Sequence, residues 1–277
     1  MIHNIIKLIR IKDWQKNLII FLPLVFSGNI NNNSHYFNLL IAFFLFCLIS
    51  SIIYIINDLK DIESDKSHLL KIHIKPLASG LLSKKIAIII LLFFSLLIIF
   101  LLIKYTIIIY HLFLYLVINT IYSFYVKKIP VLDVLIVSFG YIIRLDAGSL
   151  VIKVNTSILL ALSIFFLACF VIFIKRLVEL KNGYQIRETL TIYNEKLITY
   201  LIILSSIIFF ITLIIFIYLV KIELFLLIPI LIYLFIRYYN SAIRYNLGEF
   251  PFDLVFKDKA ILILSIITIF YLLFVYY

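Results

Sequence analysis

The sequence predicts an all-α integral membrane protein that forms a single domain over residues 1–277. Of its 277 residues, 65% are hydrophobic and only 14% are charged, whereas a water-soluble domain carries about 25% charged residues. Long apolar runs contain no charged residue, among them 86–103, 198–220 and 260–276. Because about 18 consecutive apolar residues suffice to cross a bilayer as a helix, we expect the chain to span the membrane several times.

Nine transmembrane spans are predicted, because charged or turn-forming segments separate nine apolar runs. Four connections are short: a Gly/Asn-rich segment at 27–35, Lys104, 153–156 and 221–223. The connections on the opposite side are longer and hold nearly all the polar residues. In chain order the predicted spans are 14–27, 36–57, 85–103, 105–122, 130–151, 156–174, 197–220, 223–239 and 260–276.

Positive charge is distributed unevenly between the two sides of the predicted bundle. The side of the N-terminus carries 21 of the 25 Lys and Arg residues. Because cytoplasmic loops of membrane proteins are enriched in Lys and Arg, we expect the N-terminus in the cytoplasm and the C-terminus outside. The net charge of +11 then reflects topology and not binding to nucleic acid. We expect a multi-pass protein of the bacterial inner (plasma) membrane with its active site facing the cytoplasm.

A cluster of acidic residues follows the second predicted span. Residues 57–65 read NDLKDIESD, and on an α-helix Asp58, Asp61 and Asp65 fall within a stripe about 60° wide. Such carboxylates repel each other unless a cation lies between them, and Mg²⁺ takes carboxylate oxygens together with waters and substrate phosphates. We therefore predict that the three aspartates bind Mg²⁺, with Asn57 beside them. A solvated acidic helix end is the alternative interpretation.

Polar and charged residues also lie inside the apolar runs. Cys47 and Cys169 are expected to be small buried hydrophobes, since no Cys/His spacing typical of zinc sites is present. A charge inside a span costs roughly 2.5–3.5 kcal/mol on the insertion scale, so Asp133, Arg144 and Asp146 need partners. We expect Arg144 to form an ion pair with another helix, whereas Asp133 lies only about one turn from the cytoplasmic end.

The acidic segment and six further segments, in the same order along the chain, resemble those of the UbiA prenyltransferase superfamily, and most closely its decaprenyl-phosphate phosphoribosyltransferases. The acidic segment at 57–65 matches the first signature of the superfamily, NDxxDxxxD. The segments that match the phosphoribosyltransferases are 10–17, 75–80, 119–127, a helix with Asp133, Arg144 and Gly148, 175–180 and 249–259.

The resemblance implies a UbiA-type bundle of nine transmembrane helices with Mg²⁺ as cofactor. It implies that a polyprenyl phosphate enters from the membrane and phosphoribosyl pyrophosphate from the cytoplasm. The implied reaction transfers 5-phosphoribose to the lipid phosphate, releases pyrophosphate and provides precursors for envelope polysaccharides. The attacking lipid phosphate is already anionic, so no general base is required. The oligomeric state stays open, a homo-oligomer included.

The loop after the sixth predicted span separates two enzymatic interpretations. Aromatic prenyltransferases of the superfamily are expected to carry a second Asp-rich motif here, whereas residues 175–187 contain one acid among four cations. Because Arg and Lys bind phosphates directly, Lys175 and Arg176 are predicted to bind the donor. A surface pair between Lys175 and Glu179 is the structural alternative, and prenyl transfer to an aromatic or other acceptor is the alternative function.

Further cations are predicted to bind substrate phosphates. Transporters place their ionisable residues near the membrane midplane, whereas 11 of the 14 acids here lie at or beyond cytoplasmic helix ends, which favours an enzyme with an interfacial site. The additional substrate-binding residues are Lys16, Lys71, Lys75, Tyr122 and Lys127, and His68 and His73 are expected to donate to phosphates or to metal-bound groups.

Overall fold

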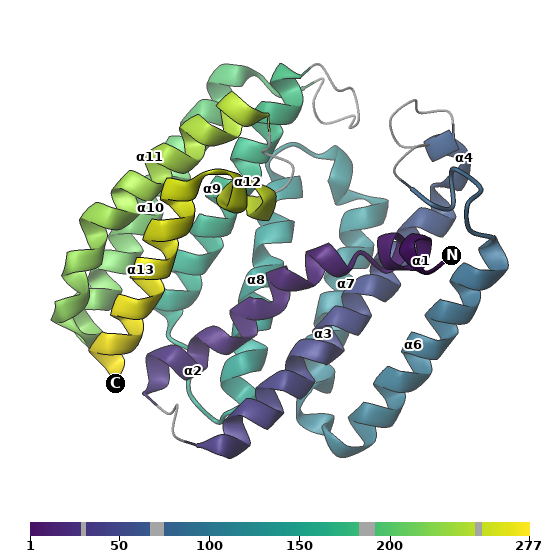
Figure 1. The fold of residues 1–277 in the computed structure, drawn as a ribbon, viewed down its shortest axis with the longest axis horizontal. Coiled ribbons are helices and arrows are strands. Elements are labelled where there is room, and N and C mark those ends of the chain that lie inside the picture. The colour runs from purple at the N-terminus through teal and green to yellow at the C-terminus, as the bar shows by residue number, and fades with distance from the viewer. Residues whose placement is uncertain (29–31, 67–74, 183–191, 247–250) are drawn as a thin grey trace. The chain divides into compact units, whose positions relative to one another are not determined.

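The chain is a helical multi-pass membrane protein. A computed structural model describes residues 1–28, 32–66, 75–182, 192–246 and 251–277, and the regular structure in these ranges is helical (Figure 1). Eight helical segments of the described residues are long and apolar enough to cross a bilayer. They are α3 (Asn33–Lys60), α6 (Lys84–Lys104), η2 with α7 (Thr106–Phe124), α8 (Leu132–Val151), α9 (Ile158–Lys181), α10 (Glu195–Val220), η5 with α11 (Ile222–Tyr245) and α13 (Lys259–Tyr276). They correspond to the second through the ninth predicted spans.

The first predicted span takes a different form. An amphipathic helix α1 (Ile2–Ile9) precedes the 3₁₀-helix η1 (Ile11–Phe21) and the short helix α2 (Leu22–Ser27). A 3₁₀-helix rises about 2.0 Å per residue against 1.5 Å in an α-helix, so this segment is more extended than predicted. Neither η1 nor α2 qualifies as a span by itself, so the total of nine and the orientation of the termini stay predictions.

The chain clusters into two compact units. Unit 1 comprises residues 1–24, 30–123 and 143–155, and unit 2 comprises 25–29, 124–142 and 156–277. Helix α8 contributes its first half to unit 2 and its second half to unit 1.

Unit 1 is built around α3, which packs against α1, η1 and α6. Side chains cap the N-termini of two helices in this unit. The Asn32 side chain accepts a hydrogen bond from the N–H of Ser34 at the start of α3, and the Ser83 side chain accepts one from the N–H of Ile86 at the start of α6. Gly148 allows the backbone of α8 to lie close to that of η1, because a Cβ atom at this position would lie 2.1 Å from the Ile20 carbonyl oxygen. Glycine is therefore required at this helix crossing.

Unit 2 is built around the antiparallel pair α9 and α10, together with α11, the short α12 (Pro251–Lys257) and α13. Phe235 of α11 stacks on Phe170 and Phe209, with ring centroids 4.2 and 4.8 Å apart. Asp258 caps α13 through the N–H groups of Ala260 and Ile261.

Neighbouring hydrogen-bond donors stabilise the negative charge of the Asp258 carboxylate. Its carboxylate accepts hydrogen bonds from Arg237 Nε at 2.8 Å and Ser241 Oγ at 2.5 Å. Burial works against the charge of this carboxylate, but the hydrogen bonds from Arg237, Ser241 and the Ile261 N–H outweigh it and lower the Asp258 pKa to about 2.

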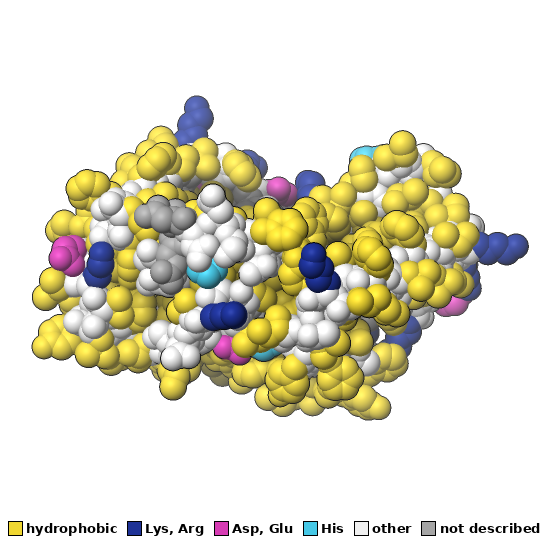
Figure 2. Space-filling view, turned by 90° about the horizontal axis from the view of Figure 1, so that it is seen from below, with side chains coloured by type: hydrophobic (Ala, Val, Ile, Leu, Met, Phe, Trp, Pro, Cys, Tyr) yellow, Lys and Arg dark blue, Asp and Glu magenta, His cyan; other side chains and the backbone are white. Residues whose placement is uncertain are grey.

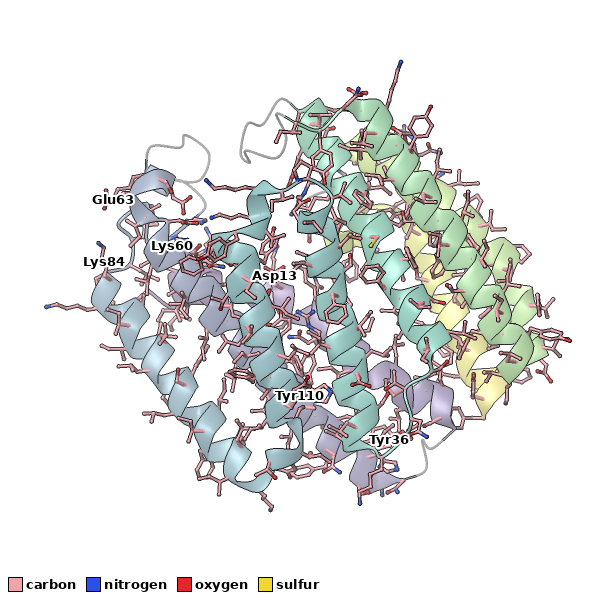
Figure 3. The ribbon with its side chains drawn as sticks, turned by 180° about the vertical axis from the view of Figure 1, so that it is seen from behind. Asp13, Tyr36, Lys60, Glu63, Lys84 and Tyr110 are labelled. Atoms are coloured by element: carbon pink, nitrogen blue, oxygen red, sulfur yellow. The ribbon has the colours of Figure 1, made fainter. Side chains whose placement is uncertain are left out.

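The surface of the helices is suited to lipid. Hydrophobic side chains cover most of the face seen in Figure 2, and large apolar side chains such as Phe100, Ile103 and Phe274 are exposed on α6 and α13. Within unit 1 the charged residues Lys60, Glu63 and Lys84 lie at one end of the helices and Tyr36 and Tyr110 at the other (Figure 3). The polar end is the one on which the acidic segment lies.

Candidate active site

The acidic segment of unit 1 spans a break between two helices. Helix α3 ends at Lys60, Asp61 lies in the break, and α4 (Ile62–Lys66) follows. The N–H groups of Asp61 and Asp65 still bond to carbonyls four residues earlier, at 2.9 and 2.8 Å. The predicted α-helical spacing therefore survives the break, which explains why Asp58 and Asp65 face the same neighbours.

Asp58 and Asp65 form a buried carboxylate pair bridged by Lys75. Their side chains are only 3% and 1% exposed. Lys75 Nζ lies 2.9 Å from Asp58 Oδ1 and 2.5 Å from Asp65 Oδ2. The turn after α4 thus places an ammonium group between the two carboxylates. The two aspartates and Lys75 are therefore direct neighbours in the structure.

Arg10 is a second cation on this pair, and the sequence alone assigned it no role. Its Nη2 donates to Asp58 Oδ1 at 3.0 Å, and its guanidinium lies over the Tyr54 ring, 4.4 Å from the centroid. Burial works against the charges of Arg10 and Lys75, but the neighbouring carboxylates outweigh it and raise the pKa of both side chains. The only sequence signal was that Arg10 opens the segment 10–17.

The carboxylate pair fits a Mg²⁺ site of the kind that a substrate completes. Among the described residues, no group of three or more His, Cys, Asp or Glu side chains is close enough to hold a metal ion, so a cage formed by Asp58, Asp61 and Asp65 is not seen. Mg²⁺ commonly uses one or two carboxylates and takes its other ligands from waters and phosphates. Two buried carboxylates that already hold a cation between them match this requirement.

Unit 2 contains a second buried charge cluster, centred on Arg176 of α9. Its side chain is 2% exposed, with Nε 2.8 Å from Asp133 Oδ2 and Nη1 2.8 Å from Glu179 Oε2. Tyr193 donates from its hydroxyl to Asp133 Oδ1 at 2.8 Å and accepts from the Val131 N–H at 2.7 Å. Burial raises the pKa of Tyr193, so the hydroxyl stays a donor.

This cluster changes the interpretation of the loop after α9. The predicted positive charge of residues 175–187 did not take account of Asp133, which belongs to α8 and pairs with Arg176. Arg176 is neutralised by two carboxylates, whereas Lys175 is 29% exposed and its Nζ lies 3.8 Å from Glu179. The predicted structural pair between Lys175 and Glu179 is therefore present, although at a separation too long for a strong hydrogen bond.

The remaining predicted site residues have varied surroundings. Lys16 lies on η1 and bonds to Asp13 at 2.5 Å. Asn57 and Tyr122 are half-buried near the ends of α3 and α7 (Ile109–Phe124), and Lys127 is half-buried in η3 (Val126–Lys128). Lys71, His68 and His73 lie outside the described residues.

The charges inside α8 have polar partners. Arg144 donates from Nε to Asn17 Oδ1 at 2.6 Å and from Nη2 to Tyr115 Oη at 2.5 Å, and Asp146 lies 2.9 Å from His111 Nε2. These two partners lie on η1 and α7 and are neutral, and the ion pair that the sequence predicts for Arg144 stays a prediction. The two oxygen atoms accept hydrogen bonds from a buried cation, which would be costly to leave without partners inside a membrane.

Comparisons with known proteins identify the family of the chain. The profile of the UbiA prenyltransferase family matches residues 19–249. The decaprenyl-phosphate phosphoribosyltransferase of Mycolicibacterium smegmatis is 30% identical over 217 residues, which cover 74% of this chain and 67% of that protein. The Corynebacterium glutamicum protein of the same name is 30% identical over 200 residues, with coverages of 69% and 60%.

Solved structures share the fold at low sequence identity. A UbiA homolog from Archaeoglobus fulgidus bound to DMAPP and Mg²⁺ has a TM-score of 0.67 at 19% identity, covering 84% of this chain and 85% of that chain. A structure of digeranylgeranylglyceryl phosphate synthase has a TM-score of 0.62 at 18% identity, with coverages of 99% and 98%. The chain belongs to the UbiA prenyltransferase family.

Proposed function

We propose that the protein transfers 5-phosphoribose from phosphoribosyl pyrophosphate to a membrane polyprenyl phosphate and releases pyrophosphate. The observation that carries this proposal is the pairing of Arg176 with Asp133 and Glu179. Arg176 between these carboxylates is only 2% exposed, whereas Lys75 between Asp58 and Asp65 is 19% exposed, so Asp133 and Glu179 are the less suitable pair for a second metal-bound diphosphate. The relatives named decaprenyl-phosphate phosphoribosyltransferase support the same choice of donor and acceptor.

The acidic segment is proposed to bind the pyrophosphate of the donor through Mg²⁺. Asp58, Asp61 and Asp65 would hold the ion, with Asn57 beside them. When bound, Mg²⁺ supplies charge neutralisation and Lewis-acid polarisation of the leaving pyrophosphate. Lys75 is already within reach of Asp58 and Asp65, where it can bind a phosphate of the same donor.

The other predicted cations are proposed to bind the remaining phosphates. Lys71, Lys175 and Arg176 are assigned to the donor, and Lys16, Tyr122 and Lys127 to the lipid phosphate. Lys175 is the more accessible of the two α9 cations, so we expect it to contribute more to binding than Arg176. Fixed cations lower the barrier by stabilising negative charge that grows on the leaving group.

In the proposed reaction, an oxygen of the lipid phosphate forms a bond to C1 of the ribose. The bond between C1 and the pyrophosphate oxygen breaks, and its electron pair leaves with pyrophosphate. The nucleophile is an anion before the reaction, so no side chain has to remove a proton. The work of the protein is to position two anionic substrates and to shield their mutual repulsion. The lipid product would serve as a precursor for envelope polysaccharides.

The direct test is to incubate the purified protein with phosphoribosyl pyrophosphate, Mg²⁺ and a polyprenyl phosphate, and to detect a pentose-phosphate lipid by mass spectrometry. Asp58→Asn and Asp61→Asn should each abolish the product, since each removes a ligand charge at nearly constant volume. Glu63→Gln is the matched control, because Glu63 is 79% exposed and its described ion pair is with Lys66. Full activity of both aspartate variants would refute the site assignment.

Prenyl transfer from a prenyl diphosphate is the second candidate, favoured by the family name and by the solved structure bound to DMAPP and Mg²⁺. A ligand that binds only the native state raises its thermal stability. With Mg²⁺ present, phosphoribosyl pyrophosphate should therefore raise the melting temperature much more than a prenyl diphosphate. The opposite ranking, together with a prenylated aromatic product, would establish the second candidate.

A further inference from the structure

Val131, at the start of α8, has a backbone conformation that valine rarely adopts. Its φ is 68°, in the left-handed region, where a β-branched residue is a genuine outlier. The Leu132 N–H donates to the Pro130 carbonyl at 2.8 Å, so the three residues form the γ-turn with a left-handed central residue, which is rare and strained. Glycine would adopt this turn without strain. Because valine occupies it, other contacts must hold the turn.

Contacts on three sides hold Val131 in this turn. Its N–H donates to the Tyr193 hydroxyl at 2.7 Å, and its carbonyl accepts from the N–H groups of Val134 and Leu135, each at 3.0 Å. Its side chain packs against the core of unit 2. Tyr193 lies 62 residues further along the chain, so its hydroxyl is a contact that the turn and α8 cannot supply by themselves.

Tyr193 is itself well fixed. It is buried, and its hydroxyl also donates to Asp133 Oδ1 at 2.8 Å. The next residue, Asn194, caps α10 by accepting from the Lys196 N–H at 2.8 Å, so Tyr193 stands directly before a helix. The hydroxyl therefore links the start of α10 to the start of α8 within unit 2. Strained backbone persists only where the surrounding structure over-determines it, and it is concentrated at functional sites.

The turn determines the direction in which η3 joins α8. Lys127 lies in η3, and three residues separate it from Val131. The two backbone dihedrals of each residue are the soft ones of the chain, so a return of Val131 to the ordinary region would rotate η3 about the start of α8. Lys127 is one of the residues that the proposed function assigns to the lipid phosphate. Its position therefore depends on the turn.

We propose that Tyr193 is a positioning residue for the lipid acceptor: its hydroxyl keeps Val131 in the left-handed turn, and the turn orients η3 so that Lys127 can bind the lipid phosphate. Tyr193 does not touch the substrate itself. The strain at Val131 is then explained, because an unstrained backbone would direct η3 elsewhere. The inference rests on the proposed function for the role of Lys127, whereas the dependence of the turn on Tyr193 is independent of the group that is transferred.

The first test measures the position of η3 without any substrate, by pulsed electron paramagnetic resonance on the purified full-length protein. Spin labels are attached to Ile129→Cys, directly after η3, and to Ile207→Cys, about 18 Å along α10 at 1.5 Å per residue. Both positions are exposed, whereas the native Cys47 and Cys169 are buried and should not be labelled.

Tyr193→Phe removes the hydroxyl and keeps the ring, so it should shift or broaden the distance distribution between the two labels. Val131→Gly added to Tyr193→Phe should restore the narrow distribution, because glycine adopts the left-handed turn without a hydrogen bond to hold it. Tyr238→Phe is the matched control and should leave the distribution unchanged. Tyr238 is another buried tyrosine of unit 2, and its hydroxyl has no hydrogen-bond partner among the described residues.

The second test measures the kinetics of pentose-phosphate transfer with polyprenyl phosphate as the varied substrate. Tyr193→Phe should raise the KM for polyprenyl phosphate about tenfold, because a charge-assisted contact of Lys127 is lost. It should leave kcat within about twofold, since binding lost equally in the ground and transition states changes KM alone. Val131→Gly added to Tyr193→Phe should return KM to its original value. A general loss of stability would instead reduce the active fraction, and with it kcat, at constant KM.

Failure of the inference can be separated from failure of the proposed function. A distance distribution that Tyr193→Phe leaves unchanged, a displaced η3 with an unchanged KM, or a raised KM that Val131→Gly does not restore would each overturn the inference and keep the function. If Tyr193→Phe does not fold, the double variant decides, because Val131→Gly should then restore the folded yield. A protein that shows the displaced η3 but forms a prenylated product would keep the role of Tyr193 in the turn and lose the phosphoribosyl assignment.

Discussion

Replacing Arg176 should destabilise the protein far more than replacing its neighbour Lys175, although both are cations on α9. Arg176 is 2% exposed, and its guanidinium nitrogens Nε and Nη1 each lie 2.8 Å from a carboxylate oxygen, of Asp133 and of Glu179 respectively. Arg176→Met leaves two buried carboxylates facing each other without the charge between them. Removing one partner of a buried ion pair costs about 3–5 kcal/mol. Lys175→Met removes a described ion pair that is partly exposed and 3.8 Å long, and such a pair is worth about 0–1 kcal/mol.

The assay is equilibrium unfolding in mixed micelles of lipid and detergent, with the free energy of unfolding compared across the variants. A further variant supplies the control: Asp133→Asn and Glu179→Gln added to Arg176→Met should recover most of the loss. A charge-free set of similar volume avoids the cost of desolvating unpaired charges. If Arg176→Met and Lys175→Met cost the same, or if the combined variant is not rescued, the cluster does not stabilise unit 2 in the way its contacts indicate.

Three other predictions concern packing, pH and topology. Gly148→Ala should cost about 1–3 kcal/mol of unfolding free energy, because its Cβ would lie 2.1 Å from the Ile20 carbonyl oxygen; a melting temperature equal to that of the unmodified chain would contradict this packing. Asp258 has a pKa lowered to about 2, so its stabilising effect is present above about pH 4 and is lost as the pH falls through about 2. The difference in unfolding free energy between the unmodified chain and Asp258→Asn, measured at each pH, should therefore shrink as the pH falls from about 4 to about 2. A reporter fused after Tyr277 should read outside and one inserted within 63–70 should read inside; a cytoplasmic C-terminus would show that the spans are miscounted.

The membrane spans were predictable because each requirement for a span is local. A helix in lipid satisfies its own backbone hydrogen bonds and needs about 20 apolar residues, and both conditions can be read from a continuous stretch of sequence. For this reason α3, α6, α9, α10 and α13 agree with the predicted ranges to within a few residues, apart from the polar turns that extend α3 and α9.

The form of the first span was not predictable in the same way. An apolar run shows only that a segment is compatible with lipid, whereas the type of helix depends on what it packs against. Residues of η1 bond to α3 through Trp14 Nε1 to Ser51 Oγ at 3.0 Å and Asn17 Nδ2 to Cys47 Sγ at 3.2 Å. Contacts between segments about 30 or more residues apart determine the position of this extended segment.

The sequence by itself determined the class of protein, its family resemblance and the common face of two acidic residues. The spacing of Asp58 and Asp65 brings them to the same helical face, because seven residues make nearly two turns. Charges along one segment can therefore be assigned to a common face from their spacing alone. That local regularity also explains why Lys175 and Glu179, four residues apart, were expected to be neighbours.

Only the tertiary structure decided which opposite charges neutralise each other. Arg176 and Asp133 are 43 residues apart, and Arg10 and Asp58 are 48 residues apart, so no periodicity relates them. The pairing follows from the need to match every buried charge when helices pack, since an unmatched charge is very unfavourable in an apolar interior. It placed Arg176 at the centre of a buried cluster, and it placed Arg10 at the carboxylates that are proposed to bind the metal.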